Sequence, residues 1–181
     1  MKTSFEIHEP GLNVLPPGVE RHVVNGGGLT GLQIFPEDEI EIINEEGNQI
    51  CEIIVFDKDG VSDLGILNLK ENSKSSEIKK ILNSKDESSL ITNYQLKKRN
   101  LNLSSSKSAL VFNKETSPGD KIKLKSKDKC YVIFAAPGEE MLVHEQNPST
   151  DLTLFIKRSK ILNDKELSVI PDPVFDPLHE Q

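Results

Sequence analysis

Alternation of apolar and polar residues is the clearest pattern along this chain. Ile40 and Ile42 alternate with glutamates, and Ile122 and Leu124 alternate with lysines. A period of two is typical of a β-strand with one buried face and one face in water. Four further stretches are predicted to be strands because their residues are apolar, β-branched or alternating: 19–24, 29–35, 109–113 and 152–157.

One run, residues 49–56, is rich in β-branched residues and predicts another strand. A second run, residues 130–136, is apolar almost without interruption, which is typical of a strand that is covered on both faces. Pro137-Gly138 ends the second run, because proline has no N–H to donate to a β-ladder and glycine permits the turn.

The two regions of alternation look like copies of one unit. Residues 36–42 (P-E-D-E-I-E-I) parallel residues 118–124 (P-G-D-K-I-K-L), and a cysteine-containing apolar strand follows each of them. The repeat is short and degenerate. It predicts a mainly β fold, a β-sandwich or barrel-like domain of two pseudo-repeated halves.

Composition divides the chain into segments. Residues 1–28 carry Pro-Gly and Gly-Gly-Gly turns and are predicted to form an N-terminal arm, whereas residues 29–160 hold the β domain. Residues 61–108, rich in Ser, Asn and Lys, are predicted to be an insertion with a short helix at residues 76–83 and one more turn at residues 90–93. Residues 161–181 form a proline-rich tail or linker.

Charge and cysteine content limit the partners and the compartment. The 181 residues carry a formal net charge of −7, which argues against nucleic acid or an anionic membrane as the main partner. The one basic run, Lys97-Lys98-Arg99, is interpreted as solvated surface. Only two cysteines occur, and neither a signal peptide nor a membrane span is apparent, so a cytoplasmic location is predicted.

Glu140 and His144 are the candidate catalytic residues, because they follow a buried strand and a Pro-Gly turn, at a sheet end where sites often lie. Adjacent glutamates and a histidine could serve acid–base chemistry or hold a metal, but they equally suit a charged hairpin loop that protects a sheet edge. The histidines lack metal-ligand spacing, so metal content stays open. Cys51 and Cys130 occupy positions where a small buried hydrophobe fits.

A family resemblance adds to this. The motifs G-G-G-L at residues 26–29, F-P-E-D-E-I-E-I at 35–42, A-A-P-G-E-E-M at 135–141 and the tail P-D-P-V-F-D-P-L carry it. With them the chain resembles the urea carboxylase-associated family. It is similar, more closely, to the β-rich N-terminal region of aminomethyltransferases of the glycine cleavage T-protein type. The similarity covers roughly residues 15–60 and 109–181.

The resemblance implies a β-sandwich-like fold associated with tetrahydrofolate-dependent one-carbon chemistry. It implies no cofactor in this chain, because tetrahydrofolate and the catalytic residues would belong to an associated domain. The partner is then a protein domain or subunit, or a second copy of the chain. Urea carboxylase-associated relatives act in deiminase-like nitrogen metabolism and can carry a metal.

Three functions follow as hypotheses, and the sequence leaves open whether the chain is itself an enzyme. The first is an accessory, non-catalytic β domain of an aminomethyltransferase system. The second is a stand-alone metal-assisted hydrolase or deiminase that uses Glu140, His144 and either Cys51 or His22. The third is a small-molecule-binding module with a pocket between the sheets, where Gln49 and Glu52 are the candidate contacts.

Overall fold

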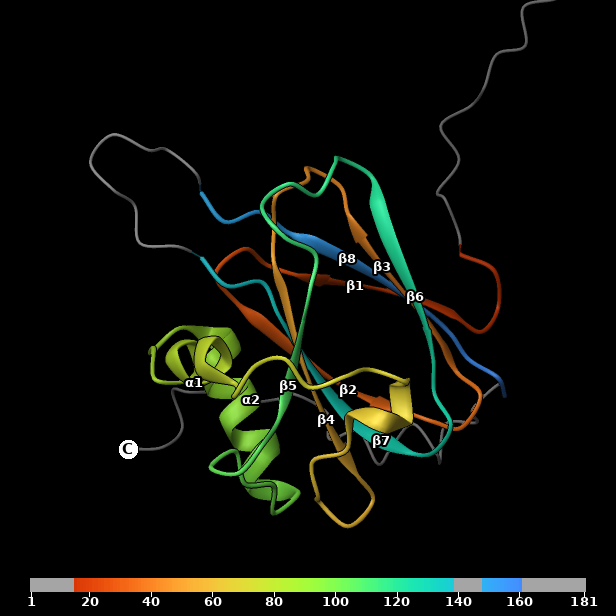
Figure 1. The fold of residues 1–181 in the computed structure, drawn as a ribbon. Helices are drawn as coiled ribbons and strands as arrows, with labels where there is room; N and C mark the ends of the chain where they lie inside the picture. Colours follow the sequence, from red (N-terminus) through yellow and green to blue (C-terminus); the bar gives the residue numbers. More distant parts are fainter. Residues whose placement is uncertain (1–14, 139–147, 161–181) are drawn as a thin grey trace, which may run out of the picture.

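A computed structural model describes residues 15–138 and 148–160. The eight strands in these residues form two four-stranded antiparallel sheets, sheet A in the order β1-β8-β3-β6 and sheet B in the order β2-β7-β4-β5 (Figure 1). In chain order the elements are β1 (Val19–Val24), β2 (Leu29–Ile34), β3 (Glu39–Asn44), β4 (Cys51–Asp57), the 3-10 helix η1 (Leu64–Leu67), α1 (Ser76–Leu82), α2 (Glu87–Lys98), β5 (Ser108–Val111), β6 (Asp120–Lys125), β7 (Cys130–Ala135) and β8 (Leu152–Lys157). The predicted β-sandwich is confirmed.

The two pseudo-repeated units lie beside each other in space. β3 of the first unit pairs with β6 of the second, with Ile42 opposite Ile122. β4 pairs with β7 in the same way, with Ile54 opposite Ile133. Each pair is antiparallel, which is the arrangement of two halves related by an approximate two-fold rotation. The sequence repeat therefore corresponds to the pairing that builds both sheets.

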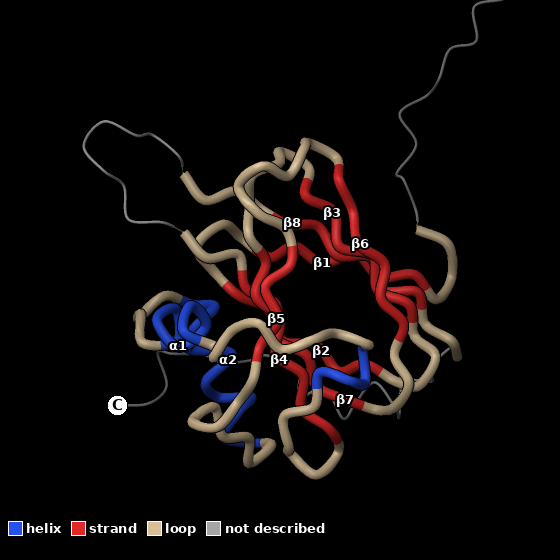
Figure 2. The backbone as a smooth tube through the Cα atoms, in the orientation of Figure 1, coloured by secondary structure: helices blue, strands red, loops and turns tan. Residues whose placement is uncertain are grey.

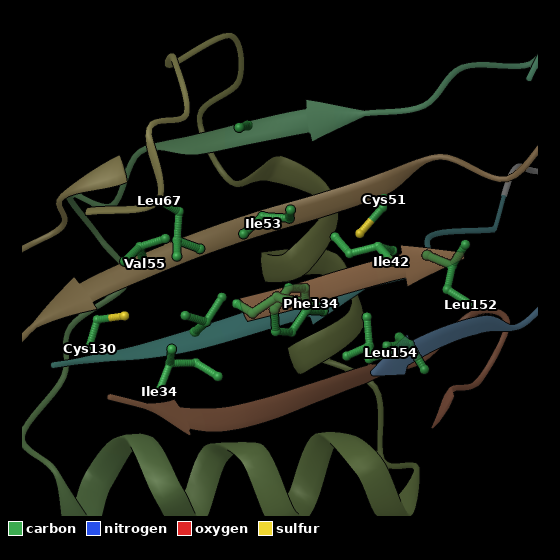
Figure 3. Packing of buried hydrophobic residues seen from close by; sticks show 14 of the residues in the cluster. Ile34, Ile42, Cys51, Ile53, Val55, Leu67, Cys130, Phe134, Leu152 and Leu154 are labelled. Carbon is green, nitrogen blue, oxygen red and sulfur yellow. The ribbon is translucent and has the colours of Figure 1, made fainter. Parts of the chain in front are cut away.

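The main core lies between the sheets and is filled by apolar side chains from both of them. Ile34, Val55 and Phe134 come from sheet B, and Ile42 and Leu154 come from sheet A (Figure 3). η1 adds three buried side chains to this core and packs against β4. Burying apolar area of this kind is the main free-energy gain of folding.

The outer faces of the two sheets differ, and the difference explains the two sequence patterns. The outer face of sheet A carries charged residues such as Glu41, whose carboxylate lies 3.5 Å from the Lys123 ammonium. This open face gives β3 and β6 their alternation. The outer face of sheet B is covered by both α-helices, which lie outside the layer of β2 and β4 (Figure 2). β4 and β7 are consequently buried on both faces.

The helices contact sheet B through a second apolar cluster, which includes Ile54, Phe56, Ile78 and Leu96. α2 packs against β2, where the Tyr131 phenol occupies the space in which a Cβ of Gly31 would stand. Close packing over a strand is one of the places where only glycine fits. No helix in the residues that the structure describes is long and apolar enough to span a bilayer.

α2 is longer than the single turn predicted at residues 90–93. It begins after Asp86, whose carboxylate accepts a hydrogen bond of 2.9 Å from the Ser89 backbone N–H. That cap satisfies a backbone donor of the first turn. A hydrogen bond from the Ser84 hydroxyl is the main cause that lowers the pKa of Asp86 to about 2. The predicted helix at residues 76–83 is present as α1.

Candidate functional site

Gln49 lies at the sheet end from which the β7–β8 connection leaves. Its side-chain amide N–H group donates to the carbonyl oxygen of Pro137 at 2.8 Å, and its amide oxygen accepts from the backbone N–H of Thr150 at 2.8 Å. Gln49 therefore holds both ends of this connection. The candidate catalytic residues Glu140 and His144 belong to residues 139–147 of the connection and lie outside the described residues.

A cavity of about 360 Å³ lies beside Gln49. Its lining is largely polar and consists of Glu46, Gly47, Asn48, Gln49, Ile50, Lys114, Pro137, Pro148, Ser149 and Thr150. The Thr150 hydroxyl oxygen is buried and has no hydrogen-bond partner among the described residues. A contact between Gln49 and a ligand stays a prediction.

Glu52 lies on the opposite face of β4 from the inter-sheet core. Its carboxylate is buried and accepts hydrogen bonds from the Ser73 hydroxyl at 3.1 Å and the Ser108 hydroxyl at 2.6 Å. It also accepts from the backbone N–H of Ile78, in the first turn of α1, at 2.8 Å. The N-cap residue Ser75 makes no side-chain cap of its own, so Glu52 supplies the cap from another element.

These contacts give Glu52 a structural role. The space between the sheets, where a ligand pocket was expected, is occupied by the main core. The carboxylate faces the helices instead, because residues at alternate positions of a strand point to opposite faces of the sheet. A binding role for Glu52 is untested by these contacts and stays a prediction.

Both cysteines are buried and unpaired, as expected for core positions. They lie at opposite ends of the β4–β7 pair (Figure 3). Burial raises the pKa of the Cys51 thiol far above neutral pH, and it raises that of Cys130 to about 11. A thiol of this kind stays protonated and is a poor nucleophile. The hypothesis that Cys51 acts in catalysis gains no support from this environment.

His22 belongs to a charged cluster at the β1 end of sheet A. Its Nε2 lies 3.0 Å from the Glu20 carboxylate, and both oxygens of Glu20 accept from the Arg158 guanidinium at 2.9 and 3.0 Å. Arg158 also donates to the Asp38 carboxylate at 2.8 Å and to the backbone oxygen of Gln33 at 2.8 Å. The cluster joins β1, β8 and the β2–β3 turn. In the described part of the chain, no three His, Cys, Asp or Glu side chains are grouped to hold a metal.

Glu20 is expected to make folding sensitive to acid. The His22 hydrogen bond, followed by the contacts with Arg158, lowers the pKa of Glu20 from 4.5 to about 2. A lowered carboxyl pKa contributes stability above pH 4.5 that is lost as the pH falls from about 4.5 to about 2. Since the side chain is partly exposed, solvent screening reduces the contribution to about 1–2 kcal/mol.

The check is the free energy of unfolding in urea, measured between pH 7 and pH 3. The difference between the parent chain and the Glu20→Gln variant should shrink on acidification. Glu115→Gln, at an exposed position, serves as the control and should show no such trend. A difference that is independent of pH would contradict the assignment.

Arg99 departs from the solvated surface predicted for the basic run. Lys97 and Lys98 are exposed, but the Arg99 guanidinium lies 4.6 Å from the centre of the Tyr131 ring. It also donates to the Gln33 side-chain oxygen at 3.0 Å. Arginine stacks on aromatic faces in this way because its guanidinium is planar and weakly hydrated. Sequence spacing gives no signal for this contact, since β2, α2 and β7 all contribute to it.

Searches for relatives connect the chain to one enzyme. It is 36% identical over 172 residues to trimethylamine-oxide aldolase of Ruegeria pomeroyi. The match covers 95% of this chain. The chain is homologous to part of that enzyme. It spans only 22% of the relative's length.

The similarity of this chain to known families and folds is limited. No family model matches the chain. A solved structure of a DUF1989 family protein from Silicibacter pomeroyi superposes with a TM-score of 0.48 and 11% identity, over 85% of this chain and 89% of that one. The relative found by sequence is not named as a glycine cleavage T-protein, so that likeness stays a prediction.

Proposed function

We propose that this chain forms an accessory β domain of a trimethylamine-oxide aldolase-type enzyme and acts through the polypeptide that it contacts. The observation that carries the proposal is the match at 36% identity, which covers 95% of the chain but only 22% of the relative. Such coverage is typical of one domain within a larger enzyme. The accessory role itself is our inference.

The contacts of four candidate residues support an accessory role, whereas Glu140 and His144 lie outside the described residues. Within the described residues, Glu52 caps a helix, Gln49 holds two backbone segments, and His22 contacts Glu20. Cys51 packs in the core. Each of these side chains is used to hold the fold together. A catalytic group, by contrast, needs access to its substrate.

The proposed link to tetrahydrofolate-dependent aminomethyltransferases is chemically compatible with this relative. All carbon atoms of trimethylamine oxide are in methyl groups, so a carbon fragment cleaved from its nitrogen has one carbon. Tetrahydrofolate, the cofactor that the aminomethyltransferase resemblance implies for an associated domain, carries one-carbon units. In this proposal the cofactor binds to an associated domain and the present chain binds none.

The test is to exchange domains. The matching stretch of the Ruegeria pomeroyi enzyme is replaced by this chain, and consumption of trimethylamine oxide is measured. We expect the chimera to retain activity, the enzyme lacking the stretch to lose it, and the isolated chain to have none. A β-sandwich of unrelated sequence in the same place is the control. A folded but inactive chimera, or turnover by the isolated chain, would refute the proposal.

The cavity beside Gln49 favours a second candidate, a small-molecule-binding function. Its polar lining, to which Thr150 belongs, suits a small polar ligand. Thermal melts with trimethylamine oxide, folates and small amines test it, with Thr150→Val as the matched variant. A ligand that raises the melting temperature of the parent chain but not of the variant supports binding there.

A further inference from the structure

α2 exposes more large apolar side chains than it buries. Leu90 is 51% exposed, Ile91 40% and Tyr94 51%. The residues that the helix buries are Ser89, Thr92 and Leu96, two of which are small and polar. An ordinary surface helix shows the opposite distribution, with its apolar stripe toward the core. The outward face of α2 is thus suited to a further contact.

The three exposed side chains form one patch, which we call the α2 patch (Leu90, Ile91 and Tyr94). Tyr94 follows Leu90 by four positions and Ile91 by three, so it neighbours both on the helix surface. Exposed polar residues, among them Glu87, Lys97 and Lys98, flank the patch along the helix. Scattered exposed apolar residues are normal, whereas an apolar patch with a polar rim marks an interaction surface.

The helix that carries the patch is firmly held. Besides its Asp86 cap, the Ser89 hydroxyl donates to the Ile81 backbone oxygen at 2.7 Å, and the Asn93 amide donates to the Leu82 backbone oxygen at 3.0 Å. These bonds fix α2 to the end of α1. A side chain presented by a fixed helix loses less conformational entropy on binding than one on a mobile loop.

We propose that the α2 patch docks against the remaining polypeptide of a trimethylamine-oxide aldolase-type enzyme. The inference rests on the proposed function. More than three-quarters of the relative lies outside its match to this chain, so a domain of this kind has a large neighbour in the same polypeptide. On this proposal the docking surface should have an apolar centre that covers Leu90 and Tyr94. Acidic side chains are expected around it, opposite Lys97 and Lys98, because opposite charges at a rim favour the correct partner.

The experiment measures association in trans between this chain and the Ruegeria pomeroyi enzyme that lacks the matching stretch. Calorimetry gives the dissociation constant for the parent chain and for the double variant Leu90→Glu/Tyr94→Glu. We expect the double variant to bind at least about tenfold more weakly, since buried aromatic residues dominate interface energetics. Because both side chains are exposed, its melting temperature should stay close to that of the parent.

The matched control is Val61→Glu, which places the same charge at another apolar position that is 60% exposed. Its dissociation constant should stay within about twofold of the parent value, as interface sites but not remote surface sites affect binding. Lys97→Glu/Lys98→Glu should also weaken association. Equal affinity of the parent, the control and the double variant would overturn the inference.

Two further measurements separate the possible failures. If the parent chain neither binds the truncated enzyme nor restores turnover of trimethylamine oxide, both the proposed function and this inference are refuted. If the parent and the double variant restore turnover and bind equally, only the inference fails. Sedimentation of the isolated chain tests whether a second copy of the chain covers the patch. A dimer of the parent chain that becomes a monomer in the double variant would assign the patch to a second copy.

Discussion

Replacing Arg158 with methionine should lower the free energy of unfolding by about 3–5 kcal/mol, because it breaks a buried ion pair by removing one partner. The Arg158 side chain is 5% exposed and that of Asp38 1%. The substitution leaves the Asp38 carboxylate buried without its cation. The backbone N–H groups of Phe35 and Ser159, which donate to it at 2.9 Å each, would remain.

Urea unfolding and thermal melts measure this effect. For a chain of this size the melting temperature should fall by roughly 10 °C, at about 2–4 °C for each kcal/mol. Arg21→Met, at an exposed position in β1, is the control and should change stability by less than about 0.5 kcal/mol. A loss below about 1 kcal/mol for Arg158→Met would show that the cluster is not important for stability.

Replacing Glu52 with alanine should cost about 3 kcal/mol, because three donors lose a buried acceptor at once. The Ile78 backbone N–H is fixed by α1 and cannot turn to another partner. The hydroxyls of Ser73 and Ser108 can rotate. Glu52→Gln should therefore cost less than alanine, since its amide oxygen can serve Ile78 while its amide N–H groups donate to the two hydroxyls.

Urea unfolding gives the stability of both Glu52 variants, and hydrogen exchange at the Ile78 amide reports the cap directly. We expect faster exchange in the alanine variant and an intermediate rate in the glutamine variant. Glu77→Ala removes a carboxylate from the same turn of α1 and should cost less than about 1 kcal/mol, because Glu77 is partly exposed and its ion pair is with the exposed Lys80. Equal stability of all three variants would contradict the role given to Glu52.

The strands could be predicted because their sequence signals are local. The alternation in β3 and β6 reflects a sheet face in water, and the continuous apolar run of β7 reflects burial on two faces. The repeat in the sequence even indicated the two halves that pair. Each of these patterns depends on whether a residue is buried, and buried positions are recognised in the sequence by their apolar side chains.

The sequence predicted only one turn of α2, at residues 90–93, for a physical reason. Its buried residues are Ser89, Thr92 and Leu96, and Leu90, Ile91 and Tyr94 are exposed, so no apolar stripe marks the core-facing side. The Asp86 cap was the signal that could have found its start. The outward stripe is also the feature from which the docking surface is inferred.

The charged cluster could not be predicted from sequence spacing. Arg158 lies 138 residues from Glu20 and 120 residues from Asp38, and only the sheet topology brings them together. The same limit applies to Glu52, whose partners Ser73, Ile78 and Ser108 follow it by 21, 26 and 56 residues. Roles for Glu140 and His144 remain predictions.

The pairing of β1 with β8 brings the two ends of the β domain side by side. Val19 lies opposite Lys157 across the ladder, and the backbone N–H of Arg158 donates to the Gly18 oxygen at 2.8 Å. A domain whose ends meet in this way can be inserted into a host polypeptide at a single point of the host chain. By the same geometry, a circularly permuted chain with residues 15 and 160 joined would keep every strand pair described here.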